Sequence, residues 1–213
     1  GFGRIGRMAF RRTYQDPEVD IIAINDLTSP EMLAYLLKHD SVQGQFDGEV
    51  SYDENGIIVD GKRIPIYAIP NPAELPWKEL DIDIAIESTG FFASRDKAKA
   101  HLEAGAKKVI IGAPAGSDVP TIVYGTNHEV LTKEDNIVSG ASCTTNCLAP
   151  MAKALNDYKE ILSGFMTTIH AYTGDQMILD APHKKGDFRR SRAAASNIVP
   201  NSTGAAKAIG LVI

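Results

Sequence analysis

Strand-like and helix-like segments alternate along the first two thirds of the chain, and this alternation restricts its possible folds more than any other feature. Short β-branched or alternating apolar runs predict buried strands, and segments with apolar residues at helical spacing predict helices. Regular alternation of the two is typical of an α/β fold, a parallel sheet with helices on both faces. The expected strands are 19–24, 82–86, 108–111, 121–124 and 137–139, and the expected helices are 6–15, 30–37, 95–104 and one that begins near Thr144.

Two regions depart from this alternation. The turn signals Asn55-Gly56 and Asp60-Gly61 lie among short alternating segments, which predicts hairpin strands at 56–59 and 63–67. A further strand-like run at 165–171 begins what we expect to be a second domain.

The composition is that of a globular chain without a polyanion-binding arm. Of the 213 residues, 44% are apolar, which is enough for a buried core, and the formal net charge is -5. This charge, with no long basic tract, argues against nucleic acid as the primary partner. No run approaches the ~18 apolar residues of a membrane span and no signal peptide is recognisable, so we expect no membrane association and a cytoplasmic location.

Three glycines at the start of the chain have the spacing G-x-G-x-x-G. Gly1, Gly3 and Gly6 allow a tight turn, close approach of the backbone to a pyrophosphate, and a helix N-terminus that faces it. Asp26 follows the next expected strand, where a carboxylate binds ribose hydroxyls and repels a 2′-phosphate, so the pattern favours NAD over NADP. The alternatives are a glycine turn that binds nothing and a turn or helix-capping aspartate.

A second candidate cofactor loop, Ser88-Thr89-Gly90, follows the expected strand 82–86. Open α/β sheets bind ligands at the carboxyl ends of their strands, which is where this loop should lie. A plain turn is an equally good interpretation of the same residues.

Cys143 lies between an expected strand and the helix that follows, so its thiol should stand near a helix N-terminus. Unpaired amides and the helix dipole favour a thiolate there, and more strongly beside a histidine. His170, on the expected strand 165–171, is a candidate base, but the sequence alone does not show which of the five histidines reaches Cys143. A buried structural thiol and a structural histidine are the alternatives.

The second cysteine, Cys147, lies four residues after Cys143 within the expected helix. We interpret it as a small buried hydrophobic residue rather than a second nucleophile. Because the two cysteines lack a second ligand pair and the chain is large enough to need no covalent staple, the pattern argues against a zinc site and a disulfide framework.

Six short segments, in order along the chain, together carry a family resemblance. They are Gly1-Phe2-Gly3-Arg4-Ile5-Gly6-Arg7, Asn25-Asp26-Leu27, Ser88-Thr89-Gly90, Ser142-Cys143-Thr144-Thr145-Asn146-Cys147, His170-Ala171-Tyr172-Thr173 and Ser202-Thr203-Gly204-Ala205-Ala206-Lys207. As a set they resemble the phosphorylating glyceraldehyde-3-phosphate dehydrogenases, and the segment around Cys143 is far more specific than the glycine spacing.

The resemblance implies a covalent mechanism. Cys143 attacks the aldehyde of glyceraldehyde 3-phosphate, His170 serves as base, hydride passes to NAD, and inorganic phosphate releases the thioester as an acyl phosphate. It also implies a homotetramer. The implied catalytic residues are Cys143 and His170; the implied NAD-binding residues are Gly1, Gly3, Arg4, Ile5, Gly6, Asn25, Asp26, Pro70, Ser88, Thr89, Gly90 and Gly112; the implied phosphate-binding residues are Ser142, Thr144, Thr173, Arg189, Thr203 and Gly204.

The resemblance further implies two domains, a Rossmann-type cofactor domain with a mostly parallel sheet at 1–143 and the start of an α+β catalytic domain at 144–213. The chain begins inside a motif that normally follows a strand and stops in the apolar run Leu211-Val212-Ile213. We therefore expect a fragment that lacks both ends, and little or no dehydrogenase turnover from residues 1–213 alone.

Two positions differ from the family pattern. Pro70 stands in Ile69-Pro70-Asn71-Pro72, where the family often has an acid, an arginine and an aspartate, so only a backbone contact to adenine is expected there. Gly112 stands where many members have serine or threonine, which likewise leaves only backbone.

Two other functions fit the same residues. A dehydrogenase of erythrose 4-phosphate shares the cysteine segment and the cofactor loop, and members of this family are also credited with binding nucleic acid or cell-surface partners without catalysis.

Apart from the family resemblance, the basic residues near Arg189 have the composition of a solvated loop. We expect Lys184 and Lys185 to be solvated in this way.

Overall fold

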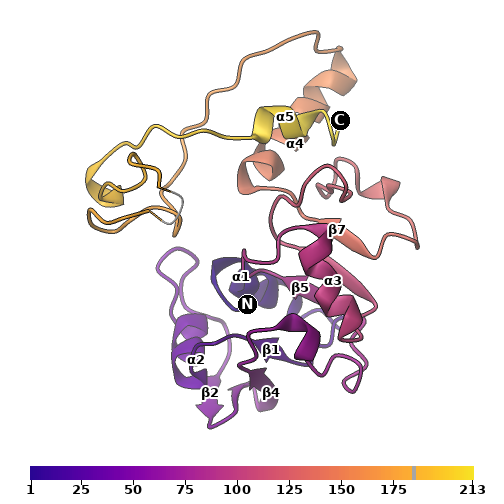
Figure 1. The fold of residues 1–213 in the computed structure, drawn as a ribbon, viewed down its shortest axis with the longest axis vertical. Helices are drawn as coiled ribbons and strands as arrows, with labels where there is room; N and C mark the ends of the chain where they lie inside the picture. The colour runs from indigo at the N-terminus through magenta and orange to yellow at the C-terminus, as the bar shows by residue number, and fades with distance from the viewer. Residues whose placement is uncertain (184–185) are drawn as a thin grey trace. The chain divides into compact units, whose positions relative to one another are not determined.

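A computed structural model describes residues 1–183 and 186–213 and divides the chain into two compact units, residues 1–142 and 143–213 (Figure 1). Lys184 and Lys185 lie outside the described residues. In the first unit the helices are α1 (Arg4–Thr13), α2 (Pro30–Lys38), α3 (Arg95–Glu103), η1 (Pro72–Glu74) and η2 (His128–Val130), and the strands are β1 (Ile24–Asn25), β2 (Val50–Asp53), β3 (Gly56–Val59), β4 (Lys62–Tyr67), β5 (Ile84–Glu87), β6 (Lys108–Ile111) and β7 (Ile137–Ser139).

The second half of this unit is a parallel three-stranded sheet in the order β5-β6-β7. Helix α3 connects β5 to β6, and it begins where predicted because Ser94 Oγ accepts a hydrogen bond from Lys97 N. It is followed by Gly105, whose φ of 110° few other residues adopt. The strand, helix, strand alternation and the α/β fold class are therefore confirmed.

The first half is a four-stranded sheet in the order β1-β4-β3-β2. Strand β1 is parallel to β4, whereas β2, β3 and β4 form the antiparallel hairpins predicted from their turn signals. Helix α2 starts at Pro30 under a Ser29 cap, as expected.

The expected strand 19–24 is wrong for most of its length, because only Ile24 and Asn25 pair with β4. The Ile66 amide donates to Asn55 on the β3 side, so the residue before it would donate on the β1 side. That residue is Pro65, which has no N–H, and pairing with β1 therefore starts only after it.

The expected strand 121–124 is also absent and is reduced to one parallel bridge between Thr121 and Ser139. The reason is local: Asn127 Oδ1 accepts from Val123 N at 2.8 Å, and the Thr126 and Asn127 amides return to Val123 O. This side-chain cap turns the backbone away from the sheet.

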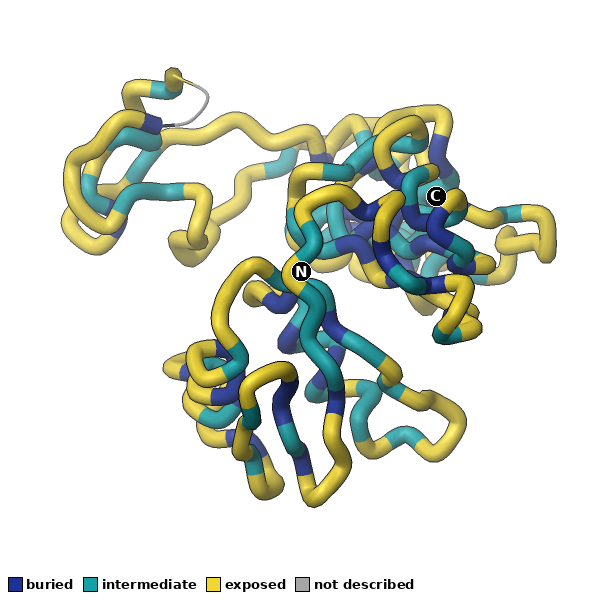
Figure 2. Tube along the Cα trace, turned by 60° about the horizontal axis from the view of Figure 1, so that its bottom comes forward, coloured by how far each residue is buried: buried dark blue, intermediate teal, exposed yellow. Residues whose placement is uncertain are grey.

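Buried apolar residues lie mainly between the helices and sheets of the first unit (Figure 2). One cluster places Leu37 of α2 and Phe10 of α1 against Ile57 and Ile64 of the hairpins. A second cluster surrounds Trp77, and a third packs Ala98 of α3 against Val109 of β6. The loops at the strand ends are therefore mounted on a packed support.

The second unit contains α4 (Cys143–Tyr158), a short η3 (Ala194–Ser196) and α5 (Ala205–Ile209), which lies beside α4 (Figure 1). The expected strand 165–171 is wrong: these residues have no strand partner among the described part of the chain, and Phe165 and Ile169 are fully exposed. A strand-like composition is insufficient without a neighbour that completes its hydrogen bonds. No helix within the described residues is long and apolar enough to span a bilayer.

Candidate active site

Cys143 is the first residue of α4, four residues after the end of β7, and its side chain is exposed. The connection turns sharply, because Ala141 has a left-handed φ of 62° and its amide donates to Ser139 Oγ at 3.1 Å. A non-glycine residue rarely adopts this conformation, and such backbone strain is found disproportionately at active sites. The predicted position of the thiol at a helix start is confirmed.

His170 is the histidine that reaches the thiol: its Nε2 lies 3.2 Å from Cys143 Sγ. Its Nδ1 lies 2.7 Å from Ala171 O, and because a carbonyl oxygen only accepts, Nδ1 must carry a proton. In the neutral ring the Nε2 lone pair therefore faces the sulfur and can take its proton. The expectation that His170 stands on a strand is wrong, because it lies in a segment that is neither helix nor strand.

The two groups shift each other's pKa in the directions that favour an ion pair. Desolvation raises the pKa of the Cys143 thiol, but the hydrogen bond and charge of His170, with hydrogen bonds from Thr144, outweigh it and bring the pKa below its usual range. The Ala171 carbonyl and the Cys143 sulfur raise the pKa of His170. Both shifts favour the thiolate and imidazolium pair over the neutral pair.

Cys147 is exposed, so its interpretation as a buried hydrophobic residue is wrong. The buried residues of α4 are Thr145 and Ala149, and a helix places a residue two positions from each of them on the opposite face.

The glycine motif has the geometry of a dinucleotide loop. Gly3 is the N-cap of α1, whose first turn carries no acidic residue and no side-chain cap, and a Cβ on Gly3 would meet nothing within 4 Å. A Cβ on Gly6 would instead lie 2.2 Å from Gly1 O. Open space before a helix N-terminus and tight packing behind it are what a pyrophosphate needs, so these residues fit the cofactor.

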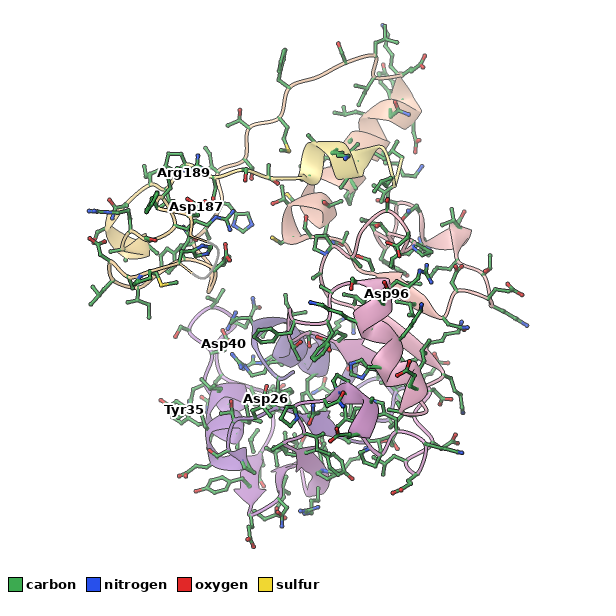
Figure 3. The ribbon with its side chains drawn as sticks, in the orientation of Figure 1. Asp26, Tyr35, Asp40, Asp96, Asp187 and Arg189 are labelled. Carbon is green, nitrogen blue, oxygen red and sulfur yellow. The ribbon has the colours of Figure 1, made fainter. Side chains whose placement is uncertain are left out.

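Asp26 lies beside this loop at the end of β1 (Figure 3). Its Oδ2 accepts from Phe2 N at 2.7 Å and its Oδ1 accepts from Thr28 N at 3.0 Å. Partial burial raises the pKa of Asp26, but these hydrogen bonds outweigh it and lower the pKa. Asp26 is therefore charged at neutral pH while it holds the glycine loop.

Five other predicted cofactor residues lie around this loop. Asn25 exchanges two hydrogen bonds of 3.0 Å with the Ile69 backbone, which holds neighbouring Pro70 at the end of β1. The Arg4 side chain pairs with buried Asp40, whose pKa falls to about 2 because it accepts hydrogen bonds from the Gln43 and Val42 amides and from Arg4. A Cβ on Gly112 would lie 3.1 Å from exposed Ile5, so a side chain at position 112 would crowd Ile5.

The predicted loop Ser88-Thr89-Gly90 contacts the glycine motif, because Ser88 Oγ donates to Gly1 O at 2.9 Å. The Thr89 amide and hydroxyl both donate to Glu87, a residue that the sequence analysis missed. The available signal was a carboxylate at the end of an otherwise apolar strand.

The predicted phosphate-binding residues are spread over the second unit and the residue before it. Ser142 precedes Cys143 and Thr144 follows it, while Gly204 is the N-cap of α5. Among the described residues, no hydrogen bond joins Thr173, Arg189 or Thr203 to the cysteine–histidine pair. Thr173 N donates to Gln176, Thr203 Oγ1 accepts from Ala205 N, and Arg189 lies beside Asp187.

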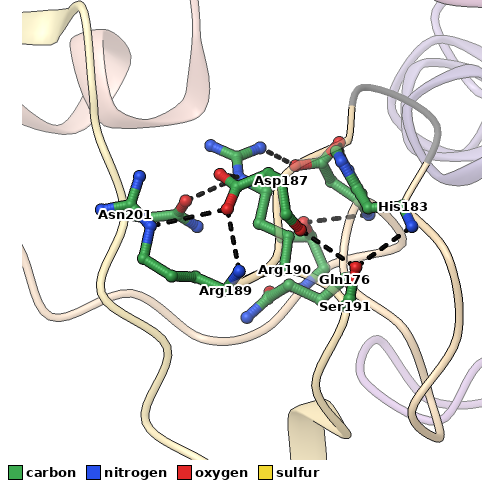
Figure 4. Close-up of polar contacts among 9 residues, drawn as sticks. Gln176, His183, Asp187, Arg189, Arg190, Ser191 and Asn201 are labelled. Carbon is green, nitrogen blue, oxygen red and sulfur yellow. Dashed lines mark hydrogen bonds and ion pairs between the residues drawn. The ribbon is translucent and has the colours of Figure 1, made fainter.

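A polar cluster centred on Asp187 surrounds Arg189 (Figure 4). Asp187 Oδ1 accepts from Arg189 N at 2.9 Å and lies 3.5 Å from its Nε, and the Arg189 side chain is 58% exposed. Arg190 pairs with Asp175 and donates to Asn201 at 2.6 Å. Arg190 is therefore a structural residue of this loop, whereas Arg189 presents a charge to solvent.

Comparison with known proteins gives a single answer. Residues 1–95 match the family profile described as glyceraldehyde 3-phosphate dehydrogenase, NAD binding domain, and residues 142–213 match its C-terminal domain. The whole chain is 60% identical to the glyceraldehyde-3-phosphate dehydrogenase of Clostridium pasteurianum over 213 residues, and 60% identical to that of Streptococcus pyogenes over 214. It spans 64% of the length of each of these curated relatives.

Proposed function

This chain belongs to the glyceraldehyde-3-phosphate dehydrogenase family, and on that premise we propose that its protein oxidises glyceraldehyde 3-phosphate to 1,3-bisphosphoglycerate with NAD and inorganic phosphate. The observation that carries the proposal is the 3.2 Å contact between Cys143 Sγ and His170 Nε2, with Nδ1 of the same ring held by Ala171 O. It gives a nucleophile and a base of fixed tautomer.

The first chemical step is attack by the Cys143 thiolate on the aldehyde carbon. The proton that left the thiol is on His170 Nε2, next to the oxygen that becomes negative, so the imidazolium stabilises the oxyanion of the hemithioacetal. His170 donates this proton to the oxyanion and becomes neutral, and it then takes the proton back from the hydroxyl group of the adduct as hydride leaves the carbon. Bound NAD supplies the hydride acceptor, and a thioester remains on Cys143.

Inorganic phosphate then attacks the thioester and regenerates the thiolate. Two anions must be bound, the phosphate of the substrate and the attacking phosphate, and we assign them to donors at Ser142, Thr144, Thr173, Arg189, Thr203 and Gly204. The exposed fork of Arg189 supports this assignment, because a planar guanidinium binds phosphate through two parallel hydrogen bonds. We also propose the division into a cofactor domain at 1–143 and a catalytic domain from 144.

The thiol that reacts first should be Cys143. We expect brief treatment with iodoacetamide near neutral pH, followed by peptide mapping, to place most of the label on Cys143, since it alone has the His170 contact. Both cysteines are exposed, so the comparison with Cys147 is controlled for access. Dominant labelling of Cys147 would show that the nucleophile is wrongly assigned.

The cofactor preference should be for NAD over NADP, because the charge of Asp26 repels a 2′-phosphate. Asp26→Ala should narrow the ratio of the two dissociation constants severalfold. The substitution also removes the hydrogen bond to Phe2, but that loss affects both nucleotides alike, so their ratio isolates the charge. Calorimetric titration with each nucleotide measures it, and an unchanged ratio would rule out this role of Asp26.

Erythrose 4-phosphate is the alternative substrate, and comparison of kcat/KM for the two aldehydes decides between them. We further propose a homotetramer in the cytoplasm, for which the family is the support and sedimentation velocity is the test of assembly. The remaining alternative is that the protein binds a partner without catalysing a reaction. This alternative predicts that Cys143→Ser leaves the binding function intact.

A further inference from the structure

A buried carboxylate lies directly beneath the Ser88-Thr89-Gly90 loop and has no part in the chemistry above. Glu87, the last residue of β5, is 3% exposed. Its Oε1 accepts from Thr89 N at 2.6 Å and from Thr89 Oγ1, and its Oε2 lies 3.0 Å from His101 Nε2. A carboxylate this deeply buried is costly unless such partners are present.

The hydrogen bonds decide the charge of this group. Burial raises the pKa of Glu87, but the hydrogen bonds from His101 and Thr89 outweigh it and lower the pKa. Glu87 is thus an ionised acceptor, and both Thr89 donors are held by a charge.

The direction of the contacts beyond Glu87 follows from Trp77. Its indole Nε1 donates to His101 Nδ1 at 3.0 Å, and because an indole N–H only donates, Nδ1 must be the acceptor. The His101 proton is therefore on Nε2, where it is donated to Glu87. Trp77 and His101 are 7% and 6% exposed, so a hydrogen-bond network with a buried centre links Trp77, His101, Glu87 and Thr89, and Glu87 accepts from His101 on one side and from Thr89 on the other.

This hydrogen-bond network fixes the conformation of the Ser88-Thr89-Gly90 loop. The Thr89 amide and hydroxyl are turned back to Glu87, and Thr89 Oγ1 in turn accepts from Phe91 N at 3.1 Å. Between them Gly90 has a φ of 77°, and a Cβ there would meet nothing within 4 Å. A Cβ on Gly1 would lie 3.0 Å from Thr89, so Thr89 also packs against the glycine motif.

We propose that Glu87 and His101 are positioning residues for the dinucleotide: they hold Thr89 so that the Gly90 turn and the glycine motif together form the cofactor site. The proposal rests on the NAD site assigned above and adds residues that do not themselves touch the cofactor.

Glu87→Gln tests the proposal with little change in size. The amide offers one acceptor oxygen where the carboxylate offers two, so either His101 or Thr89 must lose its hydrogen bond. We expect the dissociation constant for NAD, measured by calorimetry, to rise about fivefold, the effect of one hydrogen bond. Glu103→Gln is the matched control, because it removes the same charge at an exposed site on α3 and should leave the affinity unchanged.

Two substitutions at His101 separate positioning from loss of packing. His101→Gln keeps one acceptor and one donor and should retain NAD affinity, whereas His101→Leu keeps neither and should lose it to the same extent as Glu87→Gln. Trp77 is the sole tryptophan, so the tryptophan fluorescence of the protein reports directly on this hydrogen-bond network. NAD should change that emission in the unchanged protein and in His101→Gln, and the change should be smaller in His101→Leu.

Thermal melting curves recorded without NAD show which variants are folded. The affinities for NAD are then compared at a temperature at which all of the variants are folded. Unchanged NAD affinity in both Glu87→Gln and His101→Leu overturns the inference and leaves the proposed function standing. Failure of the unchanged protein to bind NAD overturns both.

Discussion

Gly6→Ala should weaken NAD binding by on the order of tenfold or more and lower the melting temperature by about 2–12 °C. The new Cβ would lie 2.2 Å from Gly1 O, so α1 and the start of the chain cannot keep their present separation. Forced overpacking of this kind costs about 1–3 kcal/mol, which gives the stated shift for a protein of this size. Scanning calorimetry and NAD titration measure the two effects.

Gly3→Ala is the matched control for this prediction. Its Cβ would meet nothing within 4 Å, so the melting temperature should not fall, yet the methyl group occupies the space in which the backbone approaches a pyrophosphate. We therefore expect weaker NAD binding without loss of stability. Equal melting temperatures for Gly6→Ala and Gly3→Ala would mean that the close packing around Gly6 does not contribute to stability.

His170→Asn should slow alkylation of Cys143 by iodoacetamide on the order of tenfold at about pH 6.5. A cysteine with an ordinary pKa of ~8.5 is about 1% thiolate there, whereas His170 holds the pKa of Cys143 lower. The gain in thiolate is partly offset because a less basic thiolate is a weaker nucleophile, with a Brønsted slope of about 0.5.

The pH dependence of the two rates fixes the sign of this effect. Because the pKa of Cys143 is lowered, the thiolate of the unchanged protein is already present at pH values where an unassisted thiol is protonated. The variant retains the desolvation but loses the charge, so its rate should rise only at higher pH and the difference should shrink above ~pH 8.5. His39→Asn, at an exposed histidine of α2's C-cap, is the control and should not change the rate. Parallel profiles for all three proteins would contradict the assignment of His170.

Elements with complete local signals could be predicted from the sequence. Strands 108–111 and 137–139 match β6 and β7 residue for residue, and α2 and α3 begin at their serine caps. The failures at 19–24, 121–124 and 165–171 share a cause: a strand requires a neighbour, and no local pattern reveals that Pro65 would face the expected strand 19–24 or that Asn127 caps Val123.

The candidate site likewise has some features that local sequence predicts and others that depend on the assembled fold. The position of Cys143 at a helix start follows from local sequence, but its pairing with His170 depends on how residues 159–173 return to the helix, which composition does not encode. Glu87 and His101 were missed because their roles appear only when β5, α3 and Trp77 are assembled. Cys147 was misjudged because the face of α4 that is buried depends on its packing.

Acyl transfer to Cys143 tests the central claim most directly, because it requires only the thiolate and its base. The protein is mixed with p-nitrophenyl acetate, release of p-nitrophenolate is followed, and the acylated peptide is mapped before and after inorganic phosphate is added. The account predicts a burst of p-nitrophenolate with the acetyl group on Cys143, its release by phosphate, and a burst that is much slower in His170→Asn. Acetyl found on Cys147, or a burst of equal rate in His170→Asn, would contradict it.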